Sequence, residues 1–190
     1  MKKYLKYFKY VINHKKNVFI ECWKDKQYIH AFTHDLSKFL PSEFIPYARF
    51  FEGSYPSRAT LNNVSCIRNK DKIRTKEQAK EEFEKAWEHH YKNNKHHWNY
   101  WIGQDMPEIY IRQMICDWKA MSRKFGDTAQ AFYMKNHDKI IMEHSSRVLL
   151  EFNLGLIDGV CLISNINWKE YCKRVNKTME EDLRELGYIN

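Results

Sequence analysis

Hydrophobic positions recur with a helical period along most of the chain. In residues 2–24 they follow one another at steps of three and four, which is the spacing of side chains on one face of an amphipathic helix. We therefore predict a helix over these residues, with an inward face that includes one histidine. That face consists of Tyr7, Val11, His14, Val18 and Cys22.

The helical pattern continues beyond this segment and is interrupted by turn residues. Thr75 and Gln78 have the spacing of a capping box, and Gly126 is a typical helix stop. The chain has only six Gly and four Pro, which disfavours an all-β fold with many tight turns. We expect an all-α helical bundle. The further helices are predicted at about 27–39, 42–51, 75–91 or beyond, 107–125, 128–154 and 167–186.

Residues 53–74 interrupt this pattern with a long segment that has no helical period. A loop of this length in a compact domain is typically a lid or a substrate-binding segment, or else it is disordered. The sequence does not choose between these roles.

The composition indicates a cytoplasmic protein with no membrane partner. The chain of 190 residues is 43% apolar and 15% aromatic, enough for one domain with a sizeable core. It has no apolar run of about 18 residues, and its basic N-terminus lacks the features of a signal peptide. Its five cysteines include no Cys-x-x-Cys motif, which favours reduced thiols in the cytosol.

The charge is basic and unevenly distributed. The net charge is +8, and residues 1–138 hold 25 Lys and Arg against 16 Asp and Glu, whereas residues 139–190 hold 7 against 8. A basic body suits a small anionic substrate or nucleic acid. The lysines of the N-terminal helix alternate with tyrosines that could stack on bases. A solvated lysine surface over an aromatic core face is the plainer explanation.

Histidines provide the first indication of chemistry. Seven of the nine lie between residues 14 and 97, and imidazoles with carboxylates suit Fe, Mn, Zn, Co or Ni. Asp117 shares a stripe with Met114 and Met121, and a buried carboxylate needs a cation, a donor or a metal. For any single histidine, such as His14, a structural hydrogen bond in the core is the plainer explanation.

Two histidine pairs lie seven residues apart, at His89-His90 and His96-His97. On one continuous helix, His90 and His97 fall on the apolar face, so we choose these two as the inward pair. A bend at Asn93-Asn94 would reopen the choice between His96 and His97.

The doublet His34-Asp35 is the third candidate. Neighbouring residues point about 100° apart on a helix, so they are poor partners for each other, but both can address one ion. His30 precedes His34 by four residues and is expected to lie outside the ligand group. His14, the doublet, the later histidines and Asp117 together predict a site for one or two divalent transition-metal ions.

Three segments carry a resemblance to a known family: HDLSKFLPSEFIPYARFF, AWEHHYKNNKHHW and MICDWKAM. Over about residues 5–155 the chain resembles the HD-domain superfamily of metal-dependent phosphohydrolases, and more narrowly a group of uncharacterised bacterial and phage proteins with this signature. The superfamily is a helical bundle with a histidine, a His-Asp doublet and a distal aspartate as ordered ligands. Members with two metals insert further histidines before the last aspartate. The matching positions here are His14, His34-Asp35 and Asp117, with His89, His90, His96 and His97 in the interval.

The resemblance implies hydrolysis of a phosphoester, such as a nucleotide, by a metal-activated water. Asp35 would bridge two ions and act in catalysis together with Lys38, which would meet a phosphate oxygen as a point charge. One ion would take His14, His34 and Asp117, and the other would take His90 and His97.

Several other charged residues have either a role in the site or a purely structural one. Glu43 either supports a ligand or accepts a proton, or it serves only the first turn of its helix. The arginines either form a basic rim for a nucleotide or are simply exposed. They are Arg49, Arg58, Arg68 and Arg74.

The resemblance divides the chain into an HD-like metal-binding domain over residues 1–157 and a C-terminal helical extension over 158–190. The extension either packs on the bundle or mediates self-association. Because relatives with this ligand order include a di-iron oxygenase of a polyol, an HD-fold di-iron oxygenase is an alternative function. A non-enzymatic, basic nucleic-acid-binding module is another.

Overall fold

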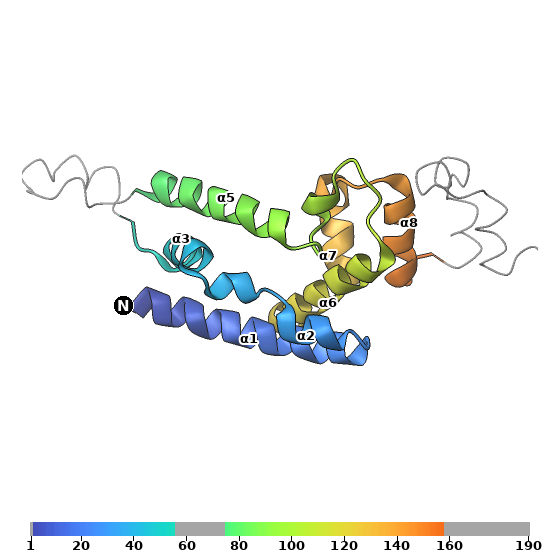
Figure 1. The fold of residues 1–190 in the computed structure, drawn as a ribbon, viewed down its shortest axis with the longest axis horizontal. Helices are drawn as coiled ribbons and strands as arrows, with labels where there is room; N and C mark the ends of the chain where they lie inside the picture. Colours follow the sequence, from blue (N-terminus) through green and yellow to red (C-terminus); the bar gives the residue numbers. More distant parts are fainter. Residues whose placement is uncertain (1, 56–74, 158–190) are drawn as a thin grey trace, which may run out of the picture. The chain divides into compact units, whose positions relative to one another are not determined.

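The computed structural model describes residues 2–55 and 75–157, and every regular element among them is a helix (Figure 1). The expectation of an all-α fold is therefore confirmed. The chain forms two compact units, residues 1–95 and 96–190, and each is described here by itself. Nearly all of the predicted loop at 53–74, with Arg58, Arg68 and Arg74, and the whole predicted extension at 158–190 lie outside the described residues.

The first unit is built on a long N-terminal helix, α1, which spans Lys2–Lys24 as predicted. The buried positions of α1 are the five residues of the predicted inward face, including His14. The other elements of this unit follow in the order α2 (Tyr28–Thr33), η1 (Leu36–Phe39), α3 (Pro41–Glu52) and α5 (Lys76–Asn93).

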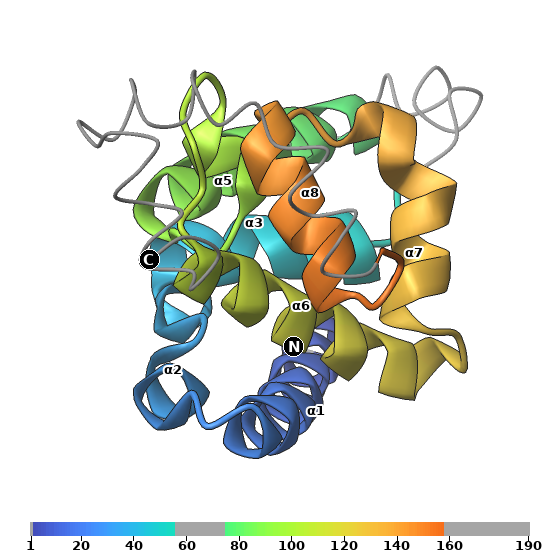
Figure 2. The ribbon, with the colours of Figure 1, turned by 90° about the vertical axis from the view of Figure 1, so that its right-hand side faces the viewer.

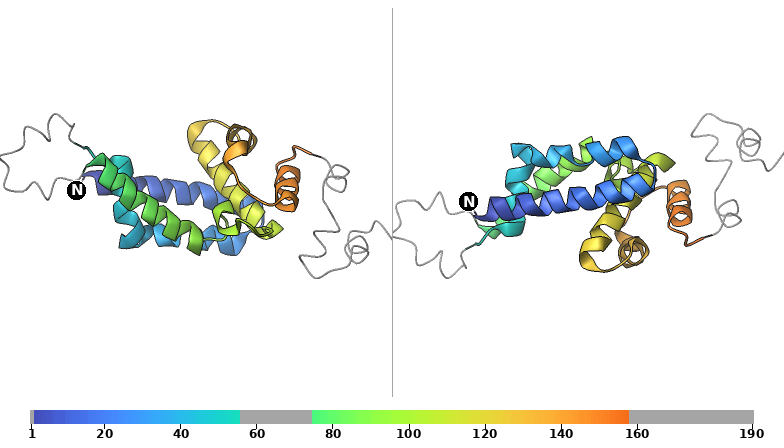
Figure 3. Two further views of the ribbon diagram at one scale, coloured as in Figure 1. Left: turned by 90° about the horizontal axis from the view of Figure 1, so that it is seen from above. Right: turned by 90° about the horizontal axis from the view of Figure 1, so that it is seen from below.

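Helix α3 lies between α1 and α5 and packs against both (Figure 1). It crosses the N-terminal part of α1, as Figure 3 shows from above and below. Pro41 occupies its first position, where the missing amide proton costs nothing. The core between the three helices is small and aromatic, with partly buried rings around it. Its buried members are Tyr7, Val11, Tyr47, Ala48 and Ala86.

The single helix predicted at 27–39 is wrong. Helix α2 ends at Thr33, and the 3-10 helix η1 begins at Leu36. Between them His34 is extended at ψ 125°, and Asp35 has the left-handed values φ 53° and ψ 30°. Aspartate tolerates this conformation better than most residues. The His-Asp doublet therefore occupies a turn between two short helices.

Helix α5 begins with the predicted capping box, in which Thr75 accepts from the Gln78 amide and the Gln78 side chain accepts from the Thr75 amide. It ends at Asn93, and Asn94 is extended at ψ 100°. His90 and His97 therefore do not share one continuous helix, so the helical phase that paired them in the sequence analysis does not apply.

The second unit contains α6 (Glu108–Phe125), α7 (Ala129–Asn136) and α8 (His144–Asn153), with the short 3-10 helices η3 (Trp98–Trp101) and η4 (His137–Lys139) (Figure 2). Gly126 caps α6 with φ 77°, as predicted. The single helix predicted at 128–154 is interrupted between η4 and α8. Tertiary contacts explain the break, since Ile140 is buried and its carbonyl accepts a hydrogen bond from the Arg147 guanidinium.

Helices α7 and α8 both pack on α6, and a second hydrophobic core forms where they meet. It includes Ile111, Met114 and Trp118 of α6, Tyr133 of α7 and Leu150 of α8. Among the residues that the structure describes, no helix is long and apolar enough to cross a membrane.

The two isoleucines at the start of α6 test this packing. Ile111 is fully buried in the core, and Ile109, two residues earlier, is exposed. We expect Ile111→Ala to lower the free energy of unfolding by about 2–5 kcal/mol, because it leaves a cavity. Ile109→Ala should change it by less than about 0.5 kcal/mol. Urea unfolding followed by tryptophan fluorescence measures both changes. Equal losses of unfolding free energy would contradict the burial of Ile111 and the exposure of Ile109 on α6.

Candidate metal centre

The turn that carries the His-Asp doublet is tied to α1 by a lysine. Nζ of Lys15 donates to the backbone carbonyls of Phe32 and His34, at 2.8 and 2.9 Å. These carbonyls lie at the end of α2, where helical partners are lacking. The lysine side chain satisfies them and fixes the position of the turn. This role is not predicted by the sequence, because the spacing of Lys15 does not distinguish it from the other lysines of α1.

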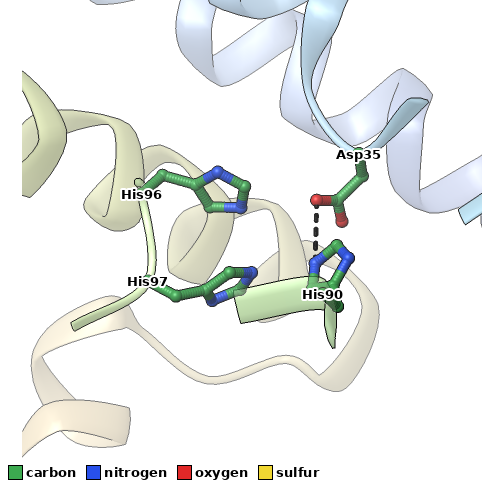
Figure 4. Close-up of side chains that lie close together, drawn as sticks. All are labelled: Asp35, His90, His96 and His97. Carbon is green, nitrogen blue, oxygen red and sulfur yellow. Dashed lines mark ion pairs between the residues drawn. The ribbon is translucent and has the colours of Figure 1, made fainter. Parts of the chain in front are cut away.

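The carboxylate of Asp35 lies at the centre of the candidate site, and its residue is only 3% exposed. Its two oxygens face different groups. Oδ2 lies 3.7 Å from Nδ1 of His34 and 4.0 Å from Nε2 of His14, and it forms an ion pair with Lys38. Oδ1 lies 3.2 Å from Nε2 of His90 (Figure 4). Three imidazoles from three elements of the chain therefore surround one buried carboxylate.

His14 and His34 approach Asp35 from the same side. Their ring centroids are 5.5 Å apart, and one nitrogen of each lies within 4.8 Å of the other. The ring of Tyr10 stacks almost parallel to His14 at 6.3 Å. His30 contacts His34 edge-on, with centroids 5.1 Å apart, so it borders the pair.

A second buried carboxylate, Glu43, holds His90 from the side opposite Asp35. Oε2 of Glu43 lies 2.8 Å from Nδ1 of His90, and both residues are 0% exposed. Ser37 donates to the same oxygen at 2.9 Å, and Oε1 lies 3.1 Å from Nδ1 of His89, whose side chain is 54% exposed. Asn94 donates to the His90 carbonyl at 2.7 Å and so closes the end of α5. Glu43 therefore supports a histidine of the site, one of the roles weighed from the sequence.

The charges of Asp35, His90 and Glu43 stabilise one another. Burial by itself raises the pKa of Glu43, but the hydrogen bond and charge of His90, with bonds from Ser37 and His89, outweigh burial and hold the pKa below its ordinary value. Burial likewise lowers the pKa of His90, but its hydrogen bonds to Asp35 and Glu43 prevail and raise it. Without a metal, both pKa shifts favour an imidazolium between two carboxylates.

The same arrangement also suits a metal ion. Nδ1 of His90 donates its proton to Glu43, so Nε2, which faces Asp35, is the nitrogen that could bind a metal once it is deprotonated. Two ligands bound at about 2.1 Å and separated by 90–110° lie about 3.0–3.4 Å from each other, close to the 3.2 Å observed here. Imidazole nitrogens and carboxylate oxygens are the donors that borderline transition metals prefer. These buried His and Asp groups could hold a metal ion.

The remaining predicted ligands, His97 and Asp117, belong to the second unit. His96 is buried and His97 is half-buried, with ring centroids 4.1 Å apart. Asp117 is half-buried on α6, three residues after the buried Met114. Their roles as ligands stay predictions from the sequence.

The comparisons with known proteins identify a family. A family model matches residues 3–155, and it is described as a family of unknown function, DUF5662. The chain belongs to this family. All the candidate ligands lie within the matched part of the DUF5662 sequence. A search of curated proteins and a search of solved structures each found no match.

The support of His90 by Glu43 leads to a prediction for this DUF5662 protein. Glu43→Gln keeps the size of the side chain but removes the charge that holds the Nδ1 proton, so we expect the affinity for a divalent transition metal to fall by about 10–100-fold. Titration with Co²⁺, read from its visible absorption, measures this. Glu82→Gln, on the half-buried partner of Arg49, is the matched control and should leave the affinity unchanged. Equal affinities in all three proteins would contradict the role of Glu43.

The pKa shifts predict how the metal-free protein responds to pH. The raised pKa of His90 contributes stability that is complete below the ordinary value of 6.5 and is lost as the pH rises through the raised pKa. The lowered pKa of Glu43 contributes stability that is complete above 4.5 and is lost as the pH falls through the lowered pKa. Both contributions are complete between pH 4.5 and 6.5, so the melting temperature after chelator treatment should fall as the pH leaves this interval in either direction. His90→Gln should remove the alkaline fall and His144→Gln should keep it; an unchanged alkaline limb in His90→Gln would refute the assignment.

Proposed function

We propose that the protein is a metal-dependent phosphohydrolase of the HD type, which hydrolyses a phosphoester with a metal-activated water. The observation that carries the proposal is the buried carboxylate of Asp35, whose two oxygens face imidazoles of different helices. A carboxylate placed in this way is suited to bridge two ions, with His14 and His34 on the side of Oδ2 and His90 on the side of Oδ1. The order of these residues in the sequence, which resembles the HD-domain superfamily, adds support.

A bound divalent metal would supply a water of lowered pKa and would neutralise charge on the phosphate oxygens. The protein side chains would have separate roles around the metal. His14, His34 and His90 would hold the metal as neutral imidazoles, and Glu43 would keep His90 in the required tautomer. The proposal does not depend on which transition metal occupies the site.

Lys38 is the residue that we propose as the contact to substrate. It forms an ion pair with Asp35, and its side chain is 15% exposed, so its ammonium group lies at the boundary between the buried carboxylate and solvent. With a metal bound by Asp35, the Lys38 ammonium group would be able to contact a phosphate oxygen. The basic charge of the chain also favours a small phosphorylated substrate over a neutral one.

The doublet itself provides the test. We expect the purified protein to carry a transition metal in stoichiometric amount, and to hydrolyse a chromogenic phosphoester or a nucleotide in a way that chelation abolishes and added metal restores. The double variant His34→Ala/Asp35→Ala should lose both the metal and at least about 100-fold in rate, because it removes the bridging carboxylate and a histidine on its Oδ2 side. Elemental analysis and a phosphate-release assay measure the two effects.

The matched control is His144→Ala/Asp127→Ala, which removes an exposed histidine and an exposed aspartate from the second unit. It should retain metal and activity. Phosphatase activity that survives in the doublet variant, or in metal-free protein, would refute the proposal. Metal-dependent consumption of oxygen with an organic substrate would replace it with the oxygenase alternative.

A further inference from the structure

The outer side of α1 and α2 carries a row of exposed apolar side chains, which we call the aromatic face. It consists of Phe8, Ile12, Phe19 and Trp23 on α1 and Tyr28 and Phe32 on α2. All except the half-buried Phe19 are exposed. Ring contacts join four of its members near the junction of α1 and α2. The ring centroids of Phe19 and Trp23 lie 5.4 Å apart, those of Phe19 and Phe32 lie 5.2 Å apart, and those of Trp23 and Tyr28 lie 4.8 Å apart. Ile29, beside them on α2, is 82% exposed. Contiguous apolar patches on a protein surface typically mark interaction sites.

The aromatic face is separate from the inward face of α1. On a helical projection the exposed stripe that includes Ile12 and Phe19 lies about 100° from the buried stripe that includes Val11 and Val18. The packing of α1 in its own unit therefore leaves this stripe uncovered. The hydrogen bonds of Lys15 to the end of α2 hold the two helices together, so the face is built on a fixed pair of elements.

The charge beside the aromatic face is positive. Helix α1 contains seven lysines and one acidic residue, Glu21. Lys9 and Lys16 are exposed, and Lys16 follows Ile12 by four residues, so these ammonium groups border the exposed stripe. Glu21 pairs with Lys24, and its side chain is only 11% exposed. Lys6 pairs with Glu52 of α3, whereas Lys9 and Lys16 form no ion pair with any residue that the structure describes. An occupant of this face therefore meets apolar groups beside positive charge, and should itself be anionic with an apolar interior.

We propose that the aromatic face docks reversibly on an anionic phospholipid bilayer. Tryptophan and tyrosine prefer the boundary between headgroups and acyl chains, and lysine side chains extend their charge to the headgroups while their stems lie along apolar surface. Exposed aromatic residues bordered by lysines on a helix that lies in the interface plane have this composition. The proposal concerns surface binding only, which is compatible with the finding that no described helix can cross a membrane.

Docking through this face is independent of the metal centre. The ligand atoms of His14, His34 and Asp35 are buried, whereas the face is formed by side chains that point outward from the same helices. Loss of vesicle binding and loss of metal therefore have separate causes, and each is measured without the other.

The full-length protein tests the proposal by co-sedimentation with vesicles. We expect binding to vesicles that contain phosphatidylserine, little binding to pure phosphatidylcholine, and a fall in binding with added salt. The charge variant Lys9→Glu/Lys16→Glu and the apolar variant Ile29→Asp should each bind at least about ten-fold more weakly. Quenching of tryptophan fluorescence by brominated lipid should decrease in Trp23→Phe, which places the contact at this face.

Two variants in the second unit serve as controls. Lys135→Glu/Lys139→Glu reverses two exposed lysines, and Ile141→Asp replaces an exposed isoleucine. Both should bind vesicles as the unmodified protein does, and all variants should keep their metal content. The absence of vesicle binding, equal binding to neutral vesicles, or equal losses in the controls would overturn the proposal. A change of oligomeric state in Ile29→Asp without any vesicle binding would assign the face to a second copy of the chain instead.

Discussion

A buried carboxylate that must be compensated organises the first unit of this protein. An ionised carboxyl group in the interior is costly unless charges and hydrogen bonds offset the loss of water. Asp35 meets this demand with an ammonium group and three imidazoles. One of these imidazoles, His90, is in turn balanced by the second buried carboxylate, Glu43. Helices α1, α3 and α5 and the 3-10 helix η1 therefore each contribute a polar group to this arrangement, and removing one leaves buried charge without its partner.

The break between α2 and η1 makes this arrangement possible. On a continuous helix His34 and Asp35 would diverge by about 100°, and only one of them would face inward fully. The left-handed conformation of Asp35 turns the chain so that both side chains are buried and the Asp35 carboxylate approaches the ring of its neighbour. The irregular backbone is thus part of the site, and the lysine clamp from α1 holds it in place.

Helix α1 presents different chemistry on its inner and outer sides. The inner side of α1 places one imidazole, His14, among apolar side chains next to the charged groups of the following turn, while its outer side presents aromatic rings and lysines. A helix of this kind is neither a plain surface helix, which would be polar outside, nor a core helix, which would be apolar all round. For a family of unknown function, these two sides supply separate and measurable hypotheses, one on chemistry and one on location.

The sequence by itself determined the helical class, the inward face of α1, the capping box of α5 and the stop at Gly126, because each depends on residues within one or two turns of the helix. It also identified His14, the His-Asp doublet and His90 as candidate metal ligands, from their order along the chain and from helical periodicity. Only the tertiary structure decided that the doublet lies in a turn, that α5 ends before His96, and that Ser37 and Lys15 support the site. These features depend on hydrogen bonds between elements far apart in the sequence, and local pattern contains no information about such partners.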